Sequence, residues 1–382
     1  MGIVVIDARR TPVAKSCPNT GIFRRVRADT LSGVLLGELW SGFRGTDRAP
    51  SAVIWGCARQ HAEQGFNIAR QAALEGGLPI KLSAMSVNRN CSSGLDAILV
   101  GAGRIATGQD DAVIAGGVEQ MDHLPLDIHQ PGPRFLLEHG PEAMRMGMCA
   151  EHLAVVRGIS RQRQDDWAHR SHQRAATATT RGDFRDETVP VAGHGADGLA
   201  LLLEKDNTIR HDSDPVKLAG LKPLFRPDGT VTAGNTSQVN AAAAAVVLMR
   251  EEQALAEGIR PLARLVSWAD TGIAPLEMGL GPVPAARKAL GRAGLSVADI
   301  DQWEINEAFA AQVIAVTDDL GLDEAKVNPR GGAIALGHPL GATGARLAVS
   351  LCRAISRGEC GRGVVALCVG GGQGVAAVFE RV

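Results

Sequence analysis

Three segments that lie far apart in the chain carry residue types suited to nucleophilic catalysis. Cys91 follows a short β-branched run and opens a long apolar-periodic one, so we expect it where a strand turns into a helix. The N-terminal turn of a helix stabilises a thiolate, which is the nucleophilic form of cysteine. Two remote motifs resemble the partners that such a nucleophile needs: residues 337–341, which contain His338, and residues 368–374, which begin with Cys368.

Each of these residues also has a purely structural interpretation. Cys91 and Cys368 could be small buried apolar residues, with the glycine-rich run 370–374 as an ordinary turn or bulge. His338 could be a hydrogen-bonded histidine in a turn. Asn306 and Glu307 are equally typical of the N-cap and first-turn acid of a helix. A dinucleotide-binding loop is disfavoured, because the glycine-rich runs do not lie between a strand and a helix.

Length and composition exclude several classes of function. The 382 residues allow two core-bearing domains or one large α/β unit with an insertion. A net charge of -1 gives no global field for nucleic acid or an acidic membrane surface, so an anionic ligand needs a local patch. The seven cysteines lack metal or disulfide spacing, which favours a reducing compartment, and we expect a cytoplasmic protein. No apolar run approaches the roughly 20 residues that span a bilayer, so no membrane segment is expected.

Short β-like runs alternate with helical patterns at both ends of the chain, which predicts a layered α/β fold. The expected strands are 3–7, 52–55, 84–88, 112–115, 262–268, 301–305, 326–328 and 364–369. The expected helices are 29–40, 67–74, 283–293, 342–355, one opened by Cys91, one after Asn306 and a helical pattern over 158–181.

The two ends of the chain can be superposed in sequence with an offset of about 240 to 250 residues. Residues 54–56 match 302–304, and residues 87–88 match 327–328. This repeat predicts a duplicated domain, with a first half over 1–259 and a second half over 260–382. Prolines, histidines and charges become frequent over about 119–230, which indicates a long insertion in the first half.

Several segments in the same order resemble the thiolase family of acyl-CoA C-acyltransferases over essentially the whole chain. They are residues 7–12, 65–70, 115–121, 231–237, 306–310 and 331–339, together with the Cys91 and Cys368 motifs. The segment 65–70, the length and the ending 379–382 are most similar to bacterial degradative 3-ketoacyl-CoA thiolases. The resemblance implies a duplicated thiolase-type fold, layered αβαβα, with two similar mixed-sheet halves and a loop-domain insertion that contacts CoA.

The resemblance also implies a mechanism. Cys91 would attack the keto carbon of a 3-oxoacyl-CoA while His338 takes its proton, and Cys368 would protonate the expelled enolate of acetyl-CoA. A second CoA, acting as co-substrate, then removes the acyl group; no permanently bound cofactor and no metal are expected. One oxyanion pocket would use His338 with a water held by Asn306, and the other the backbone N–H groups of Cys91 and Gly370.

The CoA contacts are carried over by position in the family. Arg210 is the candidate cation, although a solvated surface charge is the alternative. The other predicted substrate contacts are Leu221, Leu224 and Phe225 beside the adenine or pantetheine, Ala233 and Ser237 along the pantetheine arm, and Met146, Ala308 and Phe309, the last two at the acyl end. Two departures from the family pattern are Arg145 before Met146 and the segment 240–243, where we expect changed residues near the CoA wall.

The resemblance predicts thiolytic cleavage of 3-oxoacyl-CoA in fatty-acid β-oxidation. Alternatives are condensation of two acetyl-CoA by the same residues, a decarboxylating condensing enzyme, and a non-catalytic acyl-CoA-binding subunit. The second of these needs no protonating thiol, so Cys368 argues against it, and the joint presence of Cys91, His338, Asn306 and Cys368 argues against the third. A homodimer or homotetramer is expected, and some degradative members of the family also bind a hydratase-dehydrogenase subunit.

Overall fold

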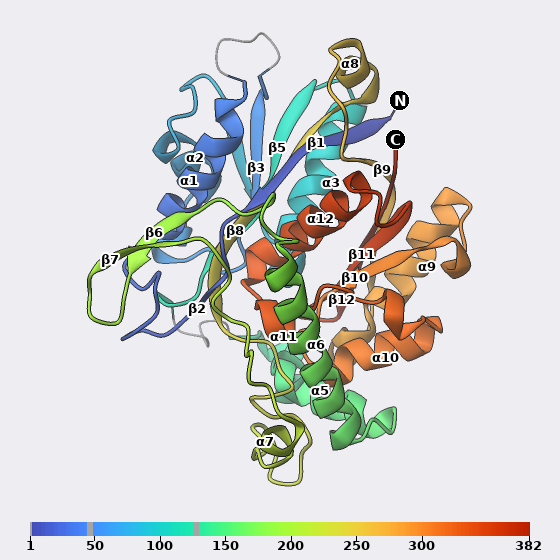
Figure 1. Ribbon diagram of the computed structural model, residues 1–382. Helices are drawn as coiled ribbons and strands as arrows, with labels where there is room; N and C mark the ends of the chain where they lie inside the picture. The colour runs from blue at the N-terminus through green and yellow to red at the C-terminus, as the bar shows by residue number, and fades with distance from the viewer. Residues whose placement is uncertain (1, 44–48, 125–129) are drawn as a thin grey trace.

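The computed structural model describes residues 2–43, 49–124 and 130–382, and within them the chain builds one ten-stranded mixed sheet (Figure 1). The strand order is β10 (Gln302–Ile305), β11 (Arg362–Val369), β12 (Gln373–Glu380), β9 (Ala263–Gly272), β1 (Ile3–Arg10), β8 (Asn240–Arg250), β5 (Ala112–Gln120), β3 (Ala52–Gly56) and β4 (Ser83–Val87), with β2 (Ala14–Lys15) paired to β8. Antiparallel pairing of β1 with both β8 and β9 joins the two halves of the sheet.

The two halves of the sheet share a similar strand pairing around a buried tryptophan. β3 pairs in parallel with β4 and β5, as β10 does with β11, and Trp55 and Trp303 are fully buried in β3 and β10. The predicted strand 326–328 is wrong, because only Val327 forms a bridge to Trp303. Asn328 ends the pairing: its backbone has a φ of 47°, and its side-chain amide bonds the N–H and C=O of Ile305 at 2.8 and 2.9 Å.

Helices pack in three layers around the two halves of the sheet. α3 (Ser93–Ala106) and α12 (Leu340–Ser356) form the central layer and share a core with strands of both halves. α1 (Ala28–Ser41) and α2 (Ile68–Glu75) cover the outer face of the first half. α9 (Pro282–Ala293) and α10 (Ala310–Leu320) cover the second. The predicted αβαβα layering is therefore confirmed.

Glycines bring the first turns of α3 and α12 into contact. A Cβ at Gly94 would lie 2.6 Å from the carbonyl oxygen of Gly341, and a Cβ at Gly344 would lie 2.6 Å from the nitrogen of Leu95. Real Cβ atoms do not approach backbone atoms so closely, so this crossing requires glycine. Because each glycine lies shortly after Cys91 or His338, the crossing also brings those two residues to the same end of the central layer.

The segment between β5 and β8 forms a separate group of helices and a small ribbon. It contains α4 (Pro133–His139), α5 (Met146–Val156), α6 (Arg161–Arg181), β6 (Val191–His194), β7 (Ala200–Leu203) and α7 (Pro215–Ala219). Figure 1 shows α5, α6 and α7 together at the end of the molecule where α10 and α11 (Ala333–Leu336) lie. The insertion was expected over about 119–230, but β5 continues through Gln120 and β8 begins only at Asn240; residues 125–129 lie outside the described residues.

One short helix, α8 (Glu251–Ala256), links β8 to β9. Among the helices of residues 2–43, 49–124 and 130–382, none combines the length and apolar character that a bilayer crossing requires. The longest of them, α6, has 21 residues and carries charges along its length.

Candidate active site

Cys91 lies in a 3-10 turn, η2 (Asn90–Ser92), between the end of β4 and the start of α3. Asn90 adopts a φ of 46°, and its side-chain amide donates to the carbonyl oxygen of Gly370 at 3.1 Å. The backbone N–H of Gly370 lies close enough to the Cys91 sulfur to lower the pKa of the thiol. The predicted position between a strand and a helix is therefore confirmed, and the turn between β11 and β12 lies directly against it.

The expected lowering of the Cys91 thiol pKa at the start of the helix is outweighed by burial. Burial raises the pKa of the Cys91 thiol to about 11 and outweighs the N–H groups of Gly370 and Cys91 and the charge of Arg59, which lower it. The charge of the buried Glu119 raises the thiol pKa further. The free protein therefore holds a neutral thiol, and a thiolate forms only if a base removes the proton.

His338 is buried, and hydrogen bonds at three of its atoms fix its position. Its backbone N–H donates to Asn240 Oδ1 at 2.9 Å, and Nδ1 lies 2.7 Å from Thr343 Oγ1. Because the Thr343 hydroxyl already donates to the carbonyl of Pro339 at 2.9 Å, it accepts a proton from Nδ1. The lone pair is then on Nε2, which faces Asn306 Nδ2 at 3.4 Å. Burial, with a smaller contribution from Arg346, lowers the His338 pKa to about 3, so the ring is a neutral base.

Asn306 follows the last residue of β10 and is fully buried. Its interpretation as a helix N-cap is wrong, because α10 begins only at Ala310 and Phe309 occupies the N-cap position. Among the described residues Asn306 Oδ1 has no hydrogen-bond partner, although it is buried. A buried amide oxygen is costly to leave unpaired, so this atom fits a bound water or substrate donor.

Cys368 is buried near the end of β11, one residue before the turn that carries Gly370. It packs in an apolar cluster, as the structural alternative predicts, and it also lies near Cys91. Burial, and in smaller part the neighbouring Cys91, raises the pKa of the Cys368 thiol well above its ordinary range. Gly371 and Gly372, with φ of 87° and 84°, form the turn that leads back into β12. Cys91, Cys368 and Gly370 thus meet at one place.

The residues predicted at the acyl end surround Cys368. Its cluster contains Cys149, Ala150, Val231, Met278, Ala308 and Phe309, with Met146 packed against them. The rings of Phe225 and Phe309 are 6.2 Å apart at an interplanar angle of 76°. A Cβ at Gly370 would lie 3.3 Å from Met146 Sδ, which places Met146 against the turn that faces Cys91.

The predicted CoA contacts continue outward from this cluster. The backbone N–H of Ser237 donates to the carbonyl of Ala308 at 3.0 Å, and Ala233 is exposed beside it. Arg210 is partly exposed, and its guanidinium makes only a long contact of 3.5 Å with the carbonyl of Ala233. Leu224 and Phe225 are exposed and Leu221 is partly exposed. Arg210 thus contacts the segment that carries Ala233 and Ser237, and that segment is bonded to Ala308 of the Cys368 cluster.

Sequence reasoning missed the residues that hold the site in place. Asn240 and Thr343 orient His338. Glu119, on β5, accepts the N–H groups of Ala58, Arg59 and Gly341 at 2.8 to 3.1 Å.

Glu307, which resembles a first-turn acid, is instead buried. It accepts from Trp167, Ser171, Asn328 and the N–H of Ile334. Both Glu119 and Glu307 lie inside recognised motifs, but their partners come from remote segments, so the sequence gives no signal for these contacts.

The expected change near the CoA wall is also misplaced. Ala241, Ala242 and Ala243 lie in β8, where they are buried and pair with β5, and small side chains suit a strand covered on both faces. Only Asn240 at the start of β8 reaches the site, and a Cβ at Gly337 would lie 2.5 Å from its Oδ1. The departing residues Ala241 and Ala242 therefore lie inside the sheet, next to Asn240, which supports His338.

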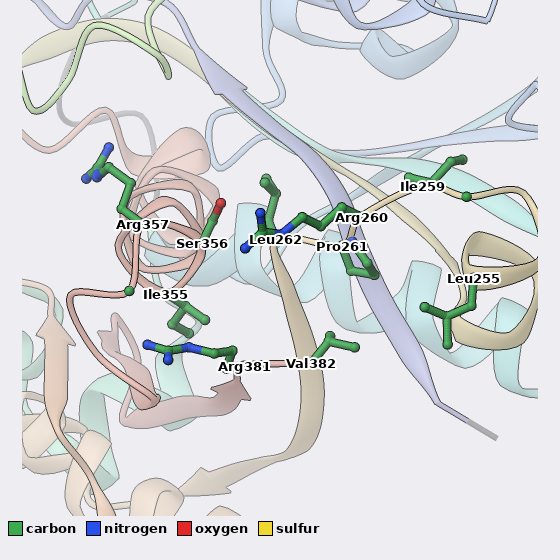
Figure 2. Close-up of a pocket in the computed structure, with 12 residues that line it drawn as sticks. Leu255, Ile259, Arg260, Pro261, Leu262, Ile355, Ser356, Arg357, Arg381 and Val382 are labelled. Carbon is green, nitrogen blue, oxygen red and sulfur yellow. The ribbon is translucent and has the colours of Figure 1, made fainter.

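A cavity of about 490 Å³ lies elsewhere, between the ends of α8 and α12 and the last residues of the chain (Figure 2). None of the predicted site residues lines it. Arg357 beside this cavity pairs with Glu359 and donates to the carbonyl of Asp183, and Arg381 donates to the carbonyl of Cys360. Arg357 and Arg381 are thus engaged by neighbouring protein groups, and neither Cys91 nor His338 lines the cavity.

Comparison with known proteins agrees with this geometry. Residues 3–252 match the family model described as "Thiolase, N-terminal domain", and residues 259–381 match "Thiolase, C-terminal domain". A protein named 3-ketoacyl-CoA thiolase from Hahella chejuensis is 46% identical over 100% of this chain and 98% of its own length, and one from Marinobacter nauticus is 45% identical with the same coverage.

Two solved structures, Bacillus anthracis acetyl-CoA acetyltransferase and human mitochondrial 3-ketoacyl-CoA thiolase, are 39% and 34% identical. Each superposes with a TM-score of 0.91 over 100% of this chain and 99% of its own. The fold, both halves of the sequence and the relatives agree, and the chain belongs to the thiolase family.

Proposed function

We propose that this protein cleaves 3-oxoacyl-CoA with CoA, giving acetyl-CoA and a shortened acyl-CoA, as in the degradation of fatty acids. The observation that carries the proposal is that Cys91 lies close enough to Cys368 to raise its thiol pKa, at the end of the central layer where α12, which begins two residues after the neutral imidazole of His338, packs against α3. The names of relatives about 45% identical over the full length of the chain support the same reaction.

Cys91 is the proposed nucleophile, and His338 is the proposed base. The Cys91 sulfur bonds to the keto carbon, its proton moves to His338 Nε2, and the keto oxygen becomes an alkoxide. Burial raises the thiol pKa and lowers the imidazole pKa, which disfavours a preformed ion pair. Proton transfer therefore accompanies attack on the carbonyl, which is general-base catalysis.

Cys368 is the proposed acid for the carbon leaving group. When the alkoxide collapses, the bond between the α and keto carbons breaks, Cys91 keeps the acyl group and the electron pair leaves as the enolate of acetyl-CoA. The Cys368 thiol gives its proton to that carbon. The incoming CoA thiol then returns a proton to Cys368, and its thiolate displaces Cys91, which recovers the proton held by His338.

Two oxyanions develop during this cycle, and the described groups offer two sets of donors. The N–H groups of Gly370 and Cys91 both lower the pKa of the Cys91 thiol, and the same two groups are the proposed donors to the thioester oxygen. On the other side, Asn306 is hydrogen-bonded to His338 and keeps Oδ1 free for a water that donates to the enolate oxygen. Arg210 and the exposed apolar residues Leu224 and Phe225 are proposed to bind CoA.

Mass spectrometry of the trapped acyl-enzyme tests this assignment. The protein is mixed with 3-oxoacyl-CoA of increasing chain length without free CoA, quenched in acid and digested. We expect the acyl label on Cys91, at a chain length that identifies the substrate, and none in Cys91→Ser. Cys57 and Cys149 serve as internal controls, because burial raises both thiol pKa values; a label on either would contradict the proposal.

The role of Cys368 is separated by a half-reaction. Cys368→Ala should still accept an acyl group on Cys91 from a simple acyl-CoA, since this exchange breaks no carbon-carbon bond. It should lose both thiolysis of 3-oxoacyl-CoA and the exchange of acetyl-CoA methyl protons with deuterated water. Retained exchange in Cys368→Ala would exclude Cys368 as the proton donor.

We also propose that the protein is a homo-oligomer. β4 is an edge strand of the sheet within the described residues, and Met85 on it, Phe66 and Ile80 expose apolar side chains. Exposed edges of this kind are commonly covered by another chain. Light scattering after size exclusion tests the proposal, and a monomer would overturn it. The cytoplasmic location and the hydratase-dehydrogenase partner stay predictions.

A further inference from the structure

The proposed CoA surface rests on a loop with little structure of its own. This wall loop, residues 218–225, carries Leu221, Leu224 and Phe225 and begins with the last two residues of α7, a helix of five residues. Its direct pairing to the opposite segment, 230–237, is a bridge between Pro223 and Thr232 and a bond from the N–H of Leu224 to the carbonyl of Val231 at 2.9 Å. Such a loop needs further contacts to fix the position of its side chains. We call the set of contacts made by Arg161, Asp165 and Asn235 the brace.

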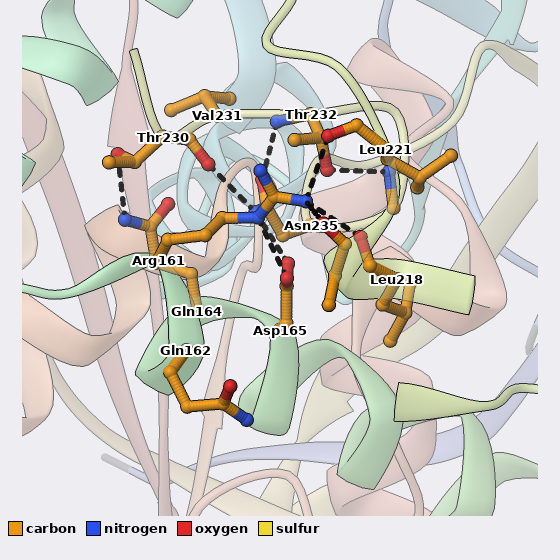
Figure 3. Close-up of polar contacts among 12 residues, drawn as sticks. Arg161, Gln162, Gln164, Asp165, Leu218, Leu221, Thr230, Val231, Thr232 and Asn235 are labelled. Atoms are coloured by element: carbon orange, nitrogen blue, oxygen red, sulfur yellow. Dashed lines mark hydrogen bonds and ion pairs between the residues drawn. The ribbon is translucent and has the colours of Figure 1, made fainter. Parts of the chain in front are cut away.

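Arg161, in the first turn of α6, supplies this brace (Figure 3). Its Nη2 donates to the carbonyl oxygens of Leu218 and Leu221 at 2.6 and 3.0 Å, with a longer contact of 3.4 Å to Ala219. Its Nε donates to Asp165 Oδ2 at 2.7 Å. The Leu218 carbonyl also accepts the N–H of Leu221 at 3.1 Å, so the guanidinium adds a charge-assisted bond that ties the end of this short helix to α6.

Asp165 extends the brace across the opposite segment to the acyl end of the site. Its Oδ1 accepts from Asn235 Nδ2 at 2.9 Å, and Asn235 Oδ1 accepts from the N–H of Thr232 at 2.8 Å. The carbonyl of Asn235 accepts the N–H of Ala310 at 2.9 Å, directly after Phe309. Arg161, Asp165 and Asn235 thus connect the wall loop, the segment 230–237 and the start of α10.

The wall loop packs closely against the backbone of the segment 230–237. A Cβ at Gly234 would lie 2.5 Å from Leu218 Cδ2 and 2.7 Å from Leu221 Cδ1, so these leucines lie directly on the backbone of Gly234. Ala233 and Ser237, the predicted pantetheine contacts, are on the same segment. A shift of the wall loop therefore changes the spacing between both sides of the CoA surface.

We infer that Arg161 is a positioning residue for CoA: with Asp165 it holds the wall loop at the spacing that the pantetheine arm and the adenine require. The identity of the ligand rests on the proposed function. Arg161 touches none of the catalytic candidates, so its loss weakens binding of the CoA portion of a substrate and leaves the chemistry at Cys91 unchanged. Lysine lacks the planar fork that reaches Asp165 and two carbonyls together, and restores the function only in part.

The chain offers a matched control two residues away. Arg163 is also in the first turn of α6, but it pairs with Asp318 and Glu324 on the outer surface and does not contact the wall loop. Arg161→Gln and Arg163→Gln therefore remove the same charge from the same helix. Arg161→Lys provides a milder variant in case the glutamine variant is poorly folded.

The experiment compares two acyl donors in the acylation of Cys91: a 3-oxoacyl-CoA and the same acyl group on N-acetylcysteamine, which lacks most of the CoA. For Arg161→Gln we expect KM for the CoA thioester to rise roughly tenfold with kcat within about twofold, and kcat/KM for the truncated thioester to stay unchanged. Arg161→Lys should lie between wild type and Arg161→Gln, and Arg163→Gln should match wild type.

Equal losses with both donors would overturn the inference, because they would show a general structural role. An unchanged KM for the CoA thioester in Arg161→Gln, or the same rise in Arg163→Gln, would overturn it as well. Calorimetric titration with free CoA separates this result from a failure of the proposed function. If wild type is not acylated by any 3-oxoacyl thioester but binds CoA, the Kd of Arg161→Gln for CoA still tests the brace.

Discussion

Thr343→Val is the sharpest test of how His338 is prepared as a base. Thr343 is fully buried, and its hydroxyl accepts from His338 Nδ1 at 2.7 Å while donating to Pro339. Valine keeps the shape and removes the oxygen. The Nδ1 proton is then left without an acceptor, or it moves to Nε2 and removes the lone pair that takes the proton of Cys91.

The magnitude follows from the cost of an unpaired buried donor, about 1–3 kcal/mol. Since about 1.4 kcal/mol corresponds to a tenfold change in rate, kcat/KM for thiolysis should fall roughly 5- to 150-fold. The assay follows the loss of 3-oxoacyl-CoA absorbance on addition of CoA. Thr343→Ser is the matched control, because it keeps the hydroxyl, and its kcat/KM should stay within about threefold of wild type.

The reasoning is refuted if Thr343→Val retains wild-type kcat/KM, or if Thr343→Ser loses as much as the valine variant. Nitrogen NMR of labelled histidine gives an independent measurement. The wild-type His338 ring should carry its proton on Nδ1, and Thr343→Val should shift the population toward Nε2. A ring protonated on Nε2 in the wild-type protein would contradict the assignment directly.

Three further predictions concern thiol reactivity, pH dependence and backbone packing. Because burial holds the Cys91 pKa at about 11, its alkylation by iodoacetamide in the free protein should keep accelerating from about pH 7 to about pH 10, and a plateau near pH 8 would contradict this. Burial lowers the His338 pKa to about 3 in the folded protein, whereas a histidine in the unfolded chain has a pKa near 6.5. The unfolded chain therefore binds more protons between about pH 3 and pH 6.5, and the free energy of unfolding decreases as the pH falls through that range. In His338→Gln the free energy of unfolding should depend less on pH there. Gly374→Ala would place a Cβ against the carbonyl oxygen of Gly281 and should lower the free energy of unfolding, measured in urea, by about 3 kcal/mol. Gly103→Ala, where no atom lies within 4 Å of the new Cβ, should raise it by up to about 1 kcal/mol. Similar urea midpoints for the two variants would refute this packing argument.

Local pattern was sufficient to predict most elements, whereas most residues of the candidate site were predicted from the resemblance to a family. The helix pattern after Cys91 and that of residues 342–355 agree with α3 and α12, and the sequence match between Trp55 and Trp303 agrees with their burial in β3 and β10. These signals are local, since periodicity and turn residues act over a few positions. The failure at 326–328 has the same origin, because the bond from Asn328 back to Ile305 joins residues 23 positions apart.

The amino-acid sequence by itself therefore determined most of the order of strands and helices and the choice of the side chains that are proposed to carry the chemistry. Only the tertiary structure decided that β1 and β9 join the halves into one sheet, and that Asn240 and Thr343 orient His338. It also decided that the Cys91 thiol is neutral at rest. Desolvation is the reason, because the pKa of a side chain depends on everything that excludes water around it, and those groups come from segments remote in sequence.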